Sequence, residues 1–354
     1  MLKPELNLTD SSIYRVPTAD PIHLIRLLST ALPHFFERFR GIRPDCTFLS
    51  CFIQDLASIR LTWMDITALV GLILMIHFIR AFVTGAAKSW VARNHIFPRY
   101  VDKFPESVWK VTYYGSSWIF SLFVHTCIPE VKSFNDPLSM WEGWSEGIPP
   151  PIHPAILLVY ASQTAFYIHS IYATLYLDIW RKDSWLMFIH HFVTITMLLL
   201  SYVDNFTLCG GLLLLLHDSS DALLDLAKLG MYLRRRKNGD YYKIIDIAGS
   251  TIFLIFVANW ILCRLYWYAC KLLYGTLYGA IYFGPQDATF FPVLGVMLVM
   301  IYALNIYWFN FIARMLWRVI TTGEEPEDNR EWDTTAVSGL SQSSLDAIAE
   351  KKKR

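Results

Sequence analysis

Seven long apolar stretches limit the folds open to this chain more than any other feature of its sequence. A transmembrane helix needs about 20 mainly apolar residues to cross a hydrocarbon core roughly 30 Å thick. Stretches of that kind lie at residues 65–84, 110–128, 155–179, 186–205, 207–229, 246–270 and 291–317. The link between the fourth and fifth is very short, so we expect a tight helical hairpin there. The sequence therefore predicts an all-α, polytopic membrane protein with about seven transmembrane helices.

The composition also indicates lipid as the main solvent. Of the 354 residues, 54% are hydrophobic and only 17% are charged, whereas about a quarter of the residues of a soluble domain are charged. The 31 basic and 30 acidic residues leave a net charge of +1, which gives no global field for binding nucleic acid. These values exclude a disordered chain and a typical cytosolic enzyme, and they argue against a nucleic-acid partner.

The charged residues between the stretches predict the orientation, because short cytosolic loops are rich in Lys and Arg. The loops after the first, third and fifth stretches are basic, with Lys88, Arg93, Arg99, Lys103, Arg181, Lys182, Arg234, Arg235, Arg236, Lys237 and Lys243. The loops after the second and fourth are acidic, with Glu130, Asp136, Glu142, Glu146 and Asp204. We therefore expect a multi-pass protein with a lumenal N-terminus and a cytosolic C-terminus.

Short signals at the two ends agree with the membrane of the endoplasmic reticulum. Asn7 begins a glycosylation sequon on the expected lumenal side, whereas the sequon at Asn205 lies too near the membrane to be modified. The final residues, 351–354, read KKKR; a dilysine retrieval signal and a solvated basic tail are equally good interpretations. The N-terminus lacks the pattern of a removable signal peptide, so the first stretch is expected to act as the signal anchor.

The chain divides around one membrane domain at residues 100–320. Residues 1–60 are expected to form a lumenal N-terminal segment, and residues 61–99 the first transmembrane helix with its cytosolic loop. Residues 321–354, rich in Glu, Asp, Ser and Thr, are expected to be a disordered cytosolic tail. The six cysteines show no paired C-x-x-C spacing, and unpaired thiols are favoured over a lumenal bridge between Cys46 and Cys51.

Ionisable residues inside two adjacent stretches mark a candidate site, because a charge at the membrane centre costs about 2.5–3.5 kcal/mol on insertion scales. At 100° per residue, one face of the fifth stretch carries His217, Asp218, Asp221, Asp225 and Lys228. On the fourth, His190, Thr194 and Ser201 share a face, and His191 lies 100° from His190. Two polar stripes on antiparallel neighbours can line a cavity. Asp221 and Asp225 are expected to approach the histidine pair, with His217 and Asp218 deeper.

Structural pairing explains any one of these residues as well as catalysis does, but the whole cluster favours a reactive site. His and Asp also suit Zn or Fe. Adjacent histidines, however, do not make the i, i+4 pair of a helical zinc site, so we predict no metal. A G-x-S-x-G nucleophile elbow is also absent from the sequence.

The run from residue 190 to residue 232 resembles the Lag1 motif of ceramide synthases, within a TLC (TRAM-LAG1-CLN8) domain. It reads HHFVTITMLLLSYVDNFTLCGGLLLLLHDSSDALLDLAKLGMY. The resemblance continues in KFPESVWK at 103–110, in QTAFYIHSIYATLYLDIWRKDS at 163–184 and at the Tyr307–Trp308 pair, and covers about residues 100–320. Residues 167–184 and NREWDT at 329–334 look most like the type 1 branch, which in the family favours stearoyl-CoA.

Two departures from the family pattern leave the acyl preference open. Many members have an Arg in the hairpin tip, where this chain reads FTLCG at 206–210, and many have Glu where this chain has Asp225. The resemblance implies a helical bundle that encloses a lipid-binding cavity and transfers a fatty acyl group from acyl-CoA to sphinganine or sphingosine. Acyl-CoA is then a co-substrate and no cofactor is implied, and membrane lipid and a homo- or heterodimer are the expected partners.

The residues suit that reaction. A neutral His can take the proton of the attacking amine, or can itself attack the thioester. We expect His190 or His191 in this role, oriented by Asp221 or Asp218, with His217 in a second proton transfer; Thr194, Ser201, Asp225 and Lys228 would support the site. Candidates for the CoA phosphates are Arg181, Lys182, Arg234, Arg235 and Arg236. The alternatives are a non-enzymatic lipid sensor or carrier with the same fold, and an acyl-CoA-dependent transferase for another lipid acceptor.

Overall fold

A computed structural model describes residues 15–40, 47–59, 62–94, 96–144, 149–178, 181–235, 239–285 and 288–322. Within these ranges the regular structure is helical. Four helices are long and apolar enough to cross a membrane: 63–94, 184–203, 243–282 and 291–322. The prediction of an all-α protein of membrane type is therefore confirmed.

Long helices coincide with each of the seven predicted stretches. They are α4 (Trp63–Asn94), α5 (Lys103–Cys127), α6 (Pro154–Tyr176), α7 (Ser184–Val203), α8 (Thr207–Leu233), α9 (Lys243–Asn259) and α11 (Phe291–Thr322). Helix α9 continues without a break through the π-helical segment η4 (Trp260–Tyr278) into α10 (Gly279–Tyr282). Short 3₁₀ turns, η2 (Pro98–Tyr100) and η3 (Pro137–Trp141), lie in the connections. The predicted sixth stretch was thus too short at its C-terminal end.

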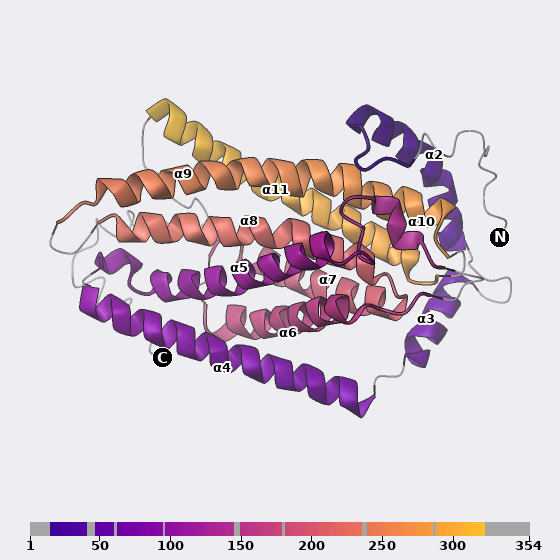
Figure 1. The fold of residues 1–354 in the computed structure, drawn as a ribbon, viewed down its shortest axis with the longest axis horizontal. Coiled ribbons are helices and arrows are strands. Elements are labelled where there is room, and N and C mark those ends of the chain that lie inside the picture. Colours follow the sequence, from indigo (N-terminus) through magenta and orange to yellow (C-terminus); the bar gives the residue numbers. More distant parts are fainter. Residues whose placement is uncertain are drawn as a thin grey trace.

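The long helices run alternately back and forth along one axis, so their connections gather at two ends (Figure 1). One end, named here the basic end, joins α4 to α5, α6 to α7 and α8 to α9. The other, the acidic end, joins α5 to α6, α7 to α8 and α10 to α11. Arg15 at the acidic end forms an ion pair with Asp136, Nε to Oδ2 2.9 Å, and contacts Glu142.

Helix α8 lies inside the bundle, between α5 and α9 (Figure 1). Its residues from 209 to 220 are buried on all sides, which explains why residues 209–216 are apolar around the whole circumference of the helix. Helices α8 and α9 touch through two glycines: a Cβ atom added to Gly230 would lie only 2.7 Å from the Cα atom of Gly249. This crossing fixes two neighbouring walls of the pocket described below.

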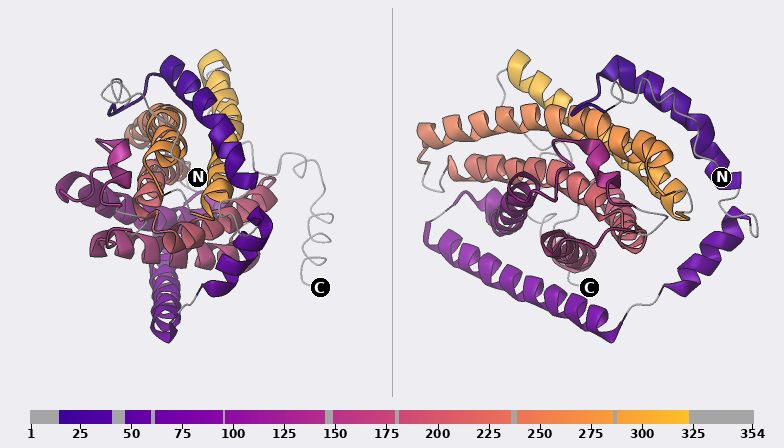
Figure 2. Two further views of the ribbon diagram at one scale, coloured as in Figure 1. Left: turned by 90° about the vertical axis from the view of Figure 1, so that its right-hand side faces the viewer. Right: turned by 45° about the vertical axis from the view of Figure 1, so that its right-hand side comes forward.

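The N-terminal part lies at the acidic end and along the side of the bundle. Helices α2 (Pro21–Arg40) and α3 (Phe48–Ser58) lie at that end, and α4 runs along the outside (Figure 2). Cys51 on α3 is buried and disulfide-bonded, so the expectation of unpaired thiols is wrong for Cys51; Cys46 is outside the described residues. The predicted tail, residues 321–354, also lies outside them from residue 323 onward.

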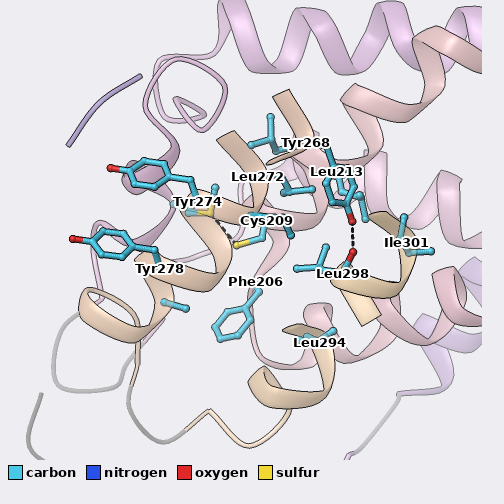
Figure 3. Close-up of a cluster of buried hydrophobic side chains, with 14 of the residues drawn as sticks. Phe206, Cys209, Leu213, Tyr268, Leu272, Tyr274, Tyr278, Leu294, Leu298 and Ile301 are labelled. Carbon is cyan, nitrogen blue, oxygen red and sulfur yellow. Dashed lines mark hydrogen bonds between the residues drawn. The ribbon is translucent and has the colours of Figure 1, made fainter. Parts of the chain in front are cut away.

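An apolar core fills the half of the bundle near the acidic end. Figure 3 shows Phe206, Cys209, Leu213 and other side chains of α8, η4 and α11 packed together. Tyr268 donates its hydroxyl hydrogen to the carbonyl oxygen of Leu298 at 2.7 Å, which satisfies the one polar atom of a fully buried ring. Most buried polar residues of α7 and α8 lie in the other half of the bundle, near the basic end.

Candidate functional site

A large pocket lies between the helices in the half of the bundle near the basic end. Its cavity volume is about 180 Å³, and its walls come from α4 to α9, η4 and α11. Its polar end is formed by Arg80, Lys110, Asp178, Arg181 and Asp183. Deeper in the bundle it is lined by His190, His191, Asp221, Arg264 and Trp308 among aromatic and aliphatic side chains. A cavity with this mixed lining is typical of a binding site for an amphipathic ligand.

Both histidines of α7 face this pocket. The ring of Tyr167 lies beside them, with centroid distances of 5.6 Å to His191 and 6.5 Å to His190. Trp308 of α11 packs against His190, with the ring planes perpendicular and the centroids 5.3 Å apart. The Nδ1 atoms of His190 and His191 are buried, and neither has a hydrogen-bond partner among the described residues. Each ring therefore keeps a nitrogen available for chemistry.

Asp221 forms an ion pair with an arginine that the sequence reasoning missed. Arg264 Nη2 lies 2.7 Å from Asp221 Oδ2 and donates to the carbonyl oxygen of His217 at 2.9 Å. The guanidinium group also stacks over Trp260, 4.3 Å from the ring centroid. Arg264 lies in the sixth apolar stretch, and a charged residue at that depth was the signal that could have found it.

Asp218 and His217 lie behind the pocket wall rather than in it. Asp218 Oδ2 accepts hydrogen bonds from Ser117 Oγ, at 2.8 Å, and from Gln163. His217 Nδ1 contacts the carbonyl oxygen of Leu213 at 2.9 Å, and its Nε2 contacts Asn305 Nδ2 at 3.2 Å. In the described part of the chain, the carboxylates of Asp218 and Asp221 thus bond to groups other than the rings of His190 and His191.

The expected supporting residues separate into two groups. Asp225 and Lys228 line the pocket, and Asp225 Oδ1 accepts a hydrogen bond from Ser107 Oγ at 2.8 Å. Thr194 donates to the carbonyl oxygen of His190 at 2.8 Å, within its own helix. Ser201 lies 3.2 Å from the Tyr160 hydroxyl and lines a second, smaller apolar pocket.

The phosphate candidates also differ in their surroundings. Arg181 lines the polar end of the pocket and shares the buried Glu106 with Lys110, at 3.1 and 2.6 Å. Lys182 is exposed beside it. Arg234 is buried and paired with Asp246 at 3.0 Å, and Arg235 lies over the ring of Tyr241. Arg236 lies outside the described residues.

Of the two sequon asparagines, the one within the described residues, Asn205, does not line the pocket. Asn7 lies outside the described residues. Asn205 has a positive φ of 58° in the tight link between α7 and α8, and its side-chain amide donates to the carbonyl oxygen of Pro150 at 2.6 Å. In the described residues, no group of three or more His, Cys, Asp or Glu is arranged to hold a metal ion.

The fold defines the chain as an all-helical protein of membrane type, and comparison of its sequence with known families places it in the TLC domain family. The sequence profile of the TLC domain matches residues 103–314. The chain is 37% identical over 244 residues to human ceramide synthase 1, covering 69% of this chain and 68% of the relative. It belongs to the ceramide synthase family, and its resemblance to the type 1 branch is confirmed.

Two further relatives show how far this similarity extends. Mouse ceramide synthase 1 is 35% identical over 261 residues, which cover 70% of this chain and 73% of the relative. Ceramide synthase LOH1 of Arabidopsis thaliana is 29% identical over 238 residues, which cover 65% and 73%. The region matched by the TLC profile covers the pocket-lining parts of α5 to α9 and η4 and most of α11, whereas α4, which contributes Arg80 to the pocket, precedes it.

Proposed function

We propose that this protein is an acyl-CoA-dependent N-acyltransferase that joins a fatty acyl group to the amine of a sphingoid base and so makes ceramide or dihydroceramide. The observation that carries the proposal is the buried pair of histidines in a large pocket of a chain that belongs to the ceramide synthases. The relatives that it resembles are themselves named ceramide synthases.

All seven long helices are proposed to span the membrane. Helices α5, α6 and α8 have 25, 23 and 27 residues, so each reaches roughly 35–40 Å at 1.5 Å per residue. They are less apolar than the four helices named above as able to cross a membrane. The seven helices alternate in direction along the chain (Figure 1). The positive-inside rule then puts the basic end in the cytosol and the N-terminus in the lumen of the endoplasmic reticulum.

The pocket suits the apolar chains of the substrates and the phosphates of CoA at different depths. The acyl and sphingoid chains would lie among the aromatic and aliphatic side chains inside the bundle, with the thioester at the depth of His190 and His191. The phosphates of CoA would remain at the polar end, near Arg181 and Lys182, because Arg binds phosphate with charge-assisted hydrogen bonds. Arg234 is a weaker candidate for this role because Asp246 already neutralises it.

Acyl transfer requires that the amine loses a proton and that the thiolate gains one. An imidazole of the histidine pair can take the proton of the amine and pass it to the departing sulfur, or can attack the thioester and form an acyl-imidazole that the amine then opens. Asp221 and Arg264 lie in the same wall as a neutral ion pair. We propose that His217 and Asp218 position this wall through their bonds to α5, α6 and α11.

The test measures transfer of acyl groups from a panel of acyl-CoAs to labelled sphinganine by the purified protein. His190→Ala and His191→Ala are compared with Thr196→Val, on the same helix but outside the pocket. Loss of a general base typically costs about 10²- to 10⁴-fold in rate, so we expect a loss of that order in at least one histidine variant and near-normal activity in the control. Near-normal turnover in both histidine variants contradicts the assignment, and a wild-type protein without transferase activity contradicts the function.

A further inference from the structure

Two hydrogen-bond donors in the pocket wall have no acceptor in the described part of the chain. They are the indole Nε1–H of Trp308 and the Nε–H of Arg264, and both are buried. Both residues line the pocket. Buried donors in native proteins nearly always have a partner, because an unpaired one costs stability. A donor left unpaired inside a binding pocket therefore points to an acceptor that arrives with the substrate.

A stacking contact and a hydrogen bond join the segments of η4 and α11 that carry these donors. The side chain of Arg264, on η4, stacks on Trp260, and Trp260 Nε1 donates to the carbonyl oxygen of Asn305 at 3.3 Å. Asn305 lies about one turn before Trp308 on α11. Trp308 in turn packs directly against His190. The unpaired indole donor is therefore next to a ring on which the proposed acyl transfer depends.

We propose that Trp308 is a catalytic residue whose N–H, assisted by Arg264 Nε–H, binds the carbonyl oxygen of the acyl thioester. This inference rests on the proposed function, because it needs a thioester carbonyl at the depth of the histidines. The same donors then hold the negative charge that develops on that oxygen. Preorganised donors of this kind often make the largest single contribution to acyl-transfer catalysis.

The charge appears in either route of transfer. When a nitrogen attacks the carbonyl carbon, a C–N bond forms and the π electrons of C=O move onto oxygen. When the intermediate collapses, C=O forms again, the C–S bond breaks and the electron pair leaves with sulfur. In the acyl-imidazole route a second intermediate follows attack by the amine, and its collapse breaks the C–N bond to the imidazole, which keeps the electron pair. In direct transfer the imidazole carries the proton of the amine to the thiolate; in the acyl-imidazole route the acyl-imidazolium gives its N–H proton to the thiolate, and the released imidazole takes the proton of the amine. The carbonyl oxygen takes no proton in either route and needs donors throughout.

Other cations of the pocket are less suited to this oxygen. Lys110 and Arg181 share Glu106, and Arg80 pairs with Asp178 at 2.6 Å. Lys110, Arg181 and Arg80 are all at the polar end of the pocket, where the phosphates of CoA are proposed to lie. Arg264 Nη2 is occupied by Asp221 and by the carbonyl oxygen of His217. The indole of Trp308 remains as the donor beside His190.

The experiment removes the N–H of Trp308 and keeps its ring. Trp308 is replaced by its benzothiophene analogue, in which sulfur takes the place of N–H, and separately by Phe; Trp317→Phe, an exposed position on the same helix, is the control. Single-donor losses in oxyanion sites cost about 100- to 1000-fold in kcat. We expect the analogue to lower kcat about 100-fold, with KM for acyl-CoA within about twofold and an unchanged thermal midpoint.

The analogue keeps the test decisive even where Trp308→Phe fails to fold. An analogue enzyme with the kcat of the wild type overturns the inference, and so does an equal loss in the Trp317→Phe control. Full activity of the analogue, together with loss of activity in the histidine variants, overturns only the role of Trp308. A wild-type protein without acyl transfer overturns both this inference and the proposed function.

Discussion

At the scale of single residues, the ion pair between Asp221 and Arg264 is the clearest structural feature that was not predicted from the sequence. Helical arithmetic placed Asp221, Asp225 and Lys228 on one face, and all three line the pocket. The partners of the carboxylates could not be predicted, because Ser117, Gln163 and Arg264 come from other helices. Periodicity within one helix says nothing about which neighbour it faces.

We predict that Asp221 and Arg264 depend on each other for stability. Removing one partner of a fully buried pair leaves an uncompensated charge and typically costs about 3–5 kcal/mol; Arg264 is buried, whereas the Asp221 side chain is 25% exposed, so we expect a smaller cost here. Asp221→Asn and Arg264→Gln should therefore each lower the thermal midpoint of the protein in detergent, and the double variant should lose less than the sum of the two. Strictly additive losses contradict the coupling. Glu130→Gln, at an exposed position, controls for the removal of a carboxylate.

At the scale of elements, apolar windows predicted where helices lie better than where they end. The sixth window stopped at residue 270, but the helix continues to residue 282. Lys271 lowers the local hydropathy, yet its ammonium group donates to the carbonyl oxygens of Pro17, at 2.7 Å, and of Phe134, at 3.0 Å. These acceptors come from distant segments at the acidic end. Mean hydropathy along the sequence makes Lys271 look like the end of a helix, because it takes no account of these distant carbonyl acceptors.

We predict that the contact between α8 and α9 tolerates no side chain at Gly230. Ala is intrinsically better than Gly in a helix by about 1 kcal/mol, but a Cβ atom here would lie 2.7 Å from the Cα atom of Gly249. Overpacking of this kind costs about 1–3 kcal/mol. Gly230→Ala should therefore lower the thermal midpoint, whereas Gly115→Ala, where nothing lies within 4 Å, should leave it unchanged or raise it. A stabilised Gly230→Ala protein is incompatible with this crossing.

At the scale of the whole molecule, the charge pattern of the loops and the position of the pocket lead to the same orientation. The alternation of the helices brings the basic connections to one end (Figure 1). Arg181, at the polar end of the pocket, lies in the connection between α6 and α7 at that end. Acyl-CoA is too polar to cross a bilayer unaided. The proposed use of cytosolic acyl-CoA therefore agrees with the proposed orientation, in which this end faces the cytosol.

This orientation predicts which loops receive glycans and which side receives substrate. A glycosylation cassette inserted after Glu130, at the acidic end, should be modified in an Asn7→Gln background, whereas the same cassette after Lys182 should not. Sealed microsomes should use added acyl-CoA without detergent, because the polar end of the pocket faces outward. A glycan at Lys182, or activity that appears only after the vesicles are permeabilised, is incompatible with a cytosolic basic end. The two measurements are independent, since glycosylation reports on which side of the membrane a loop lies, and activity in sealed microsomes reports on which side the pocket opens.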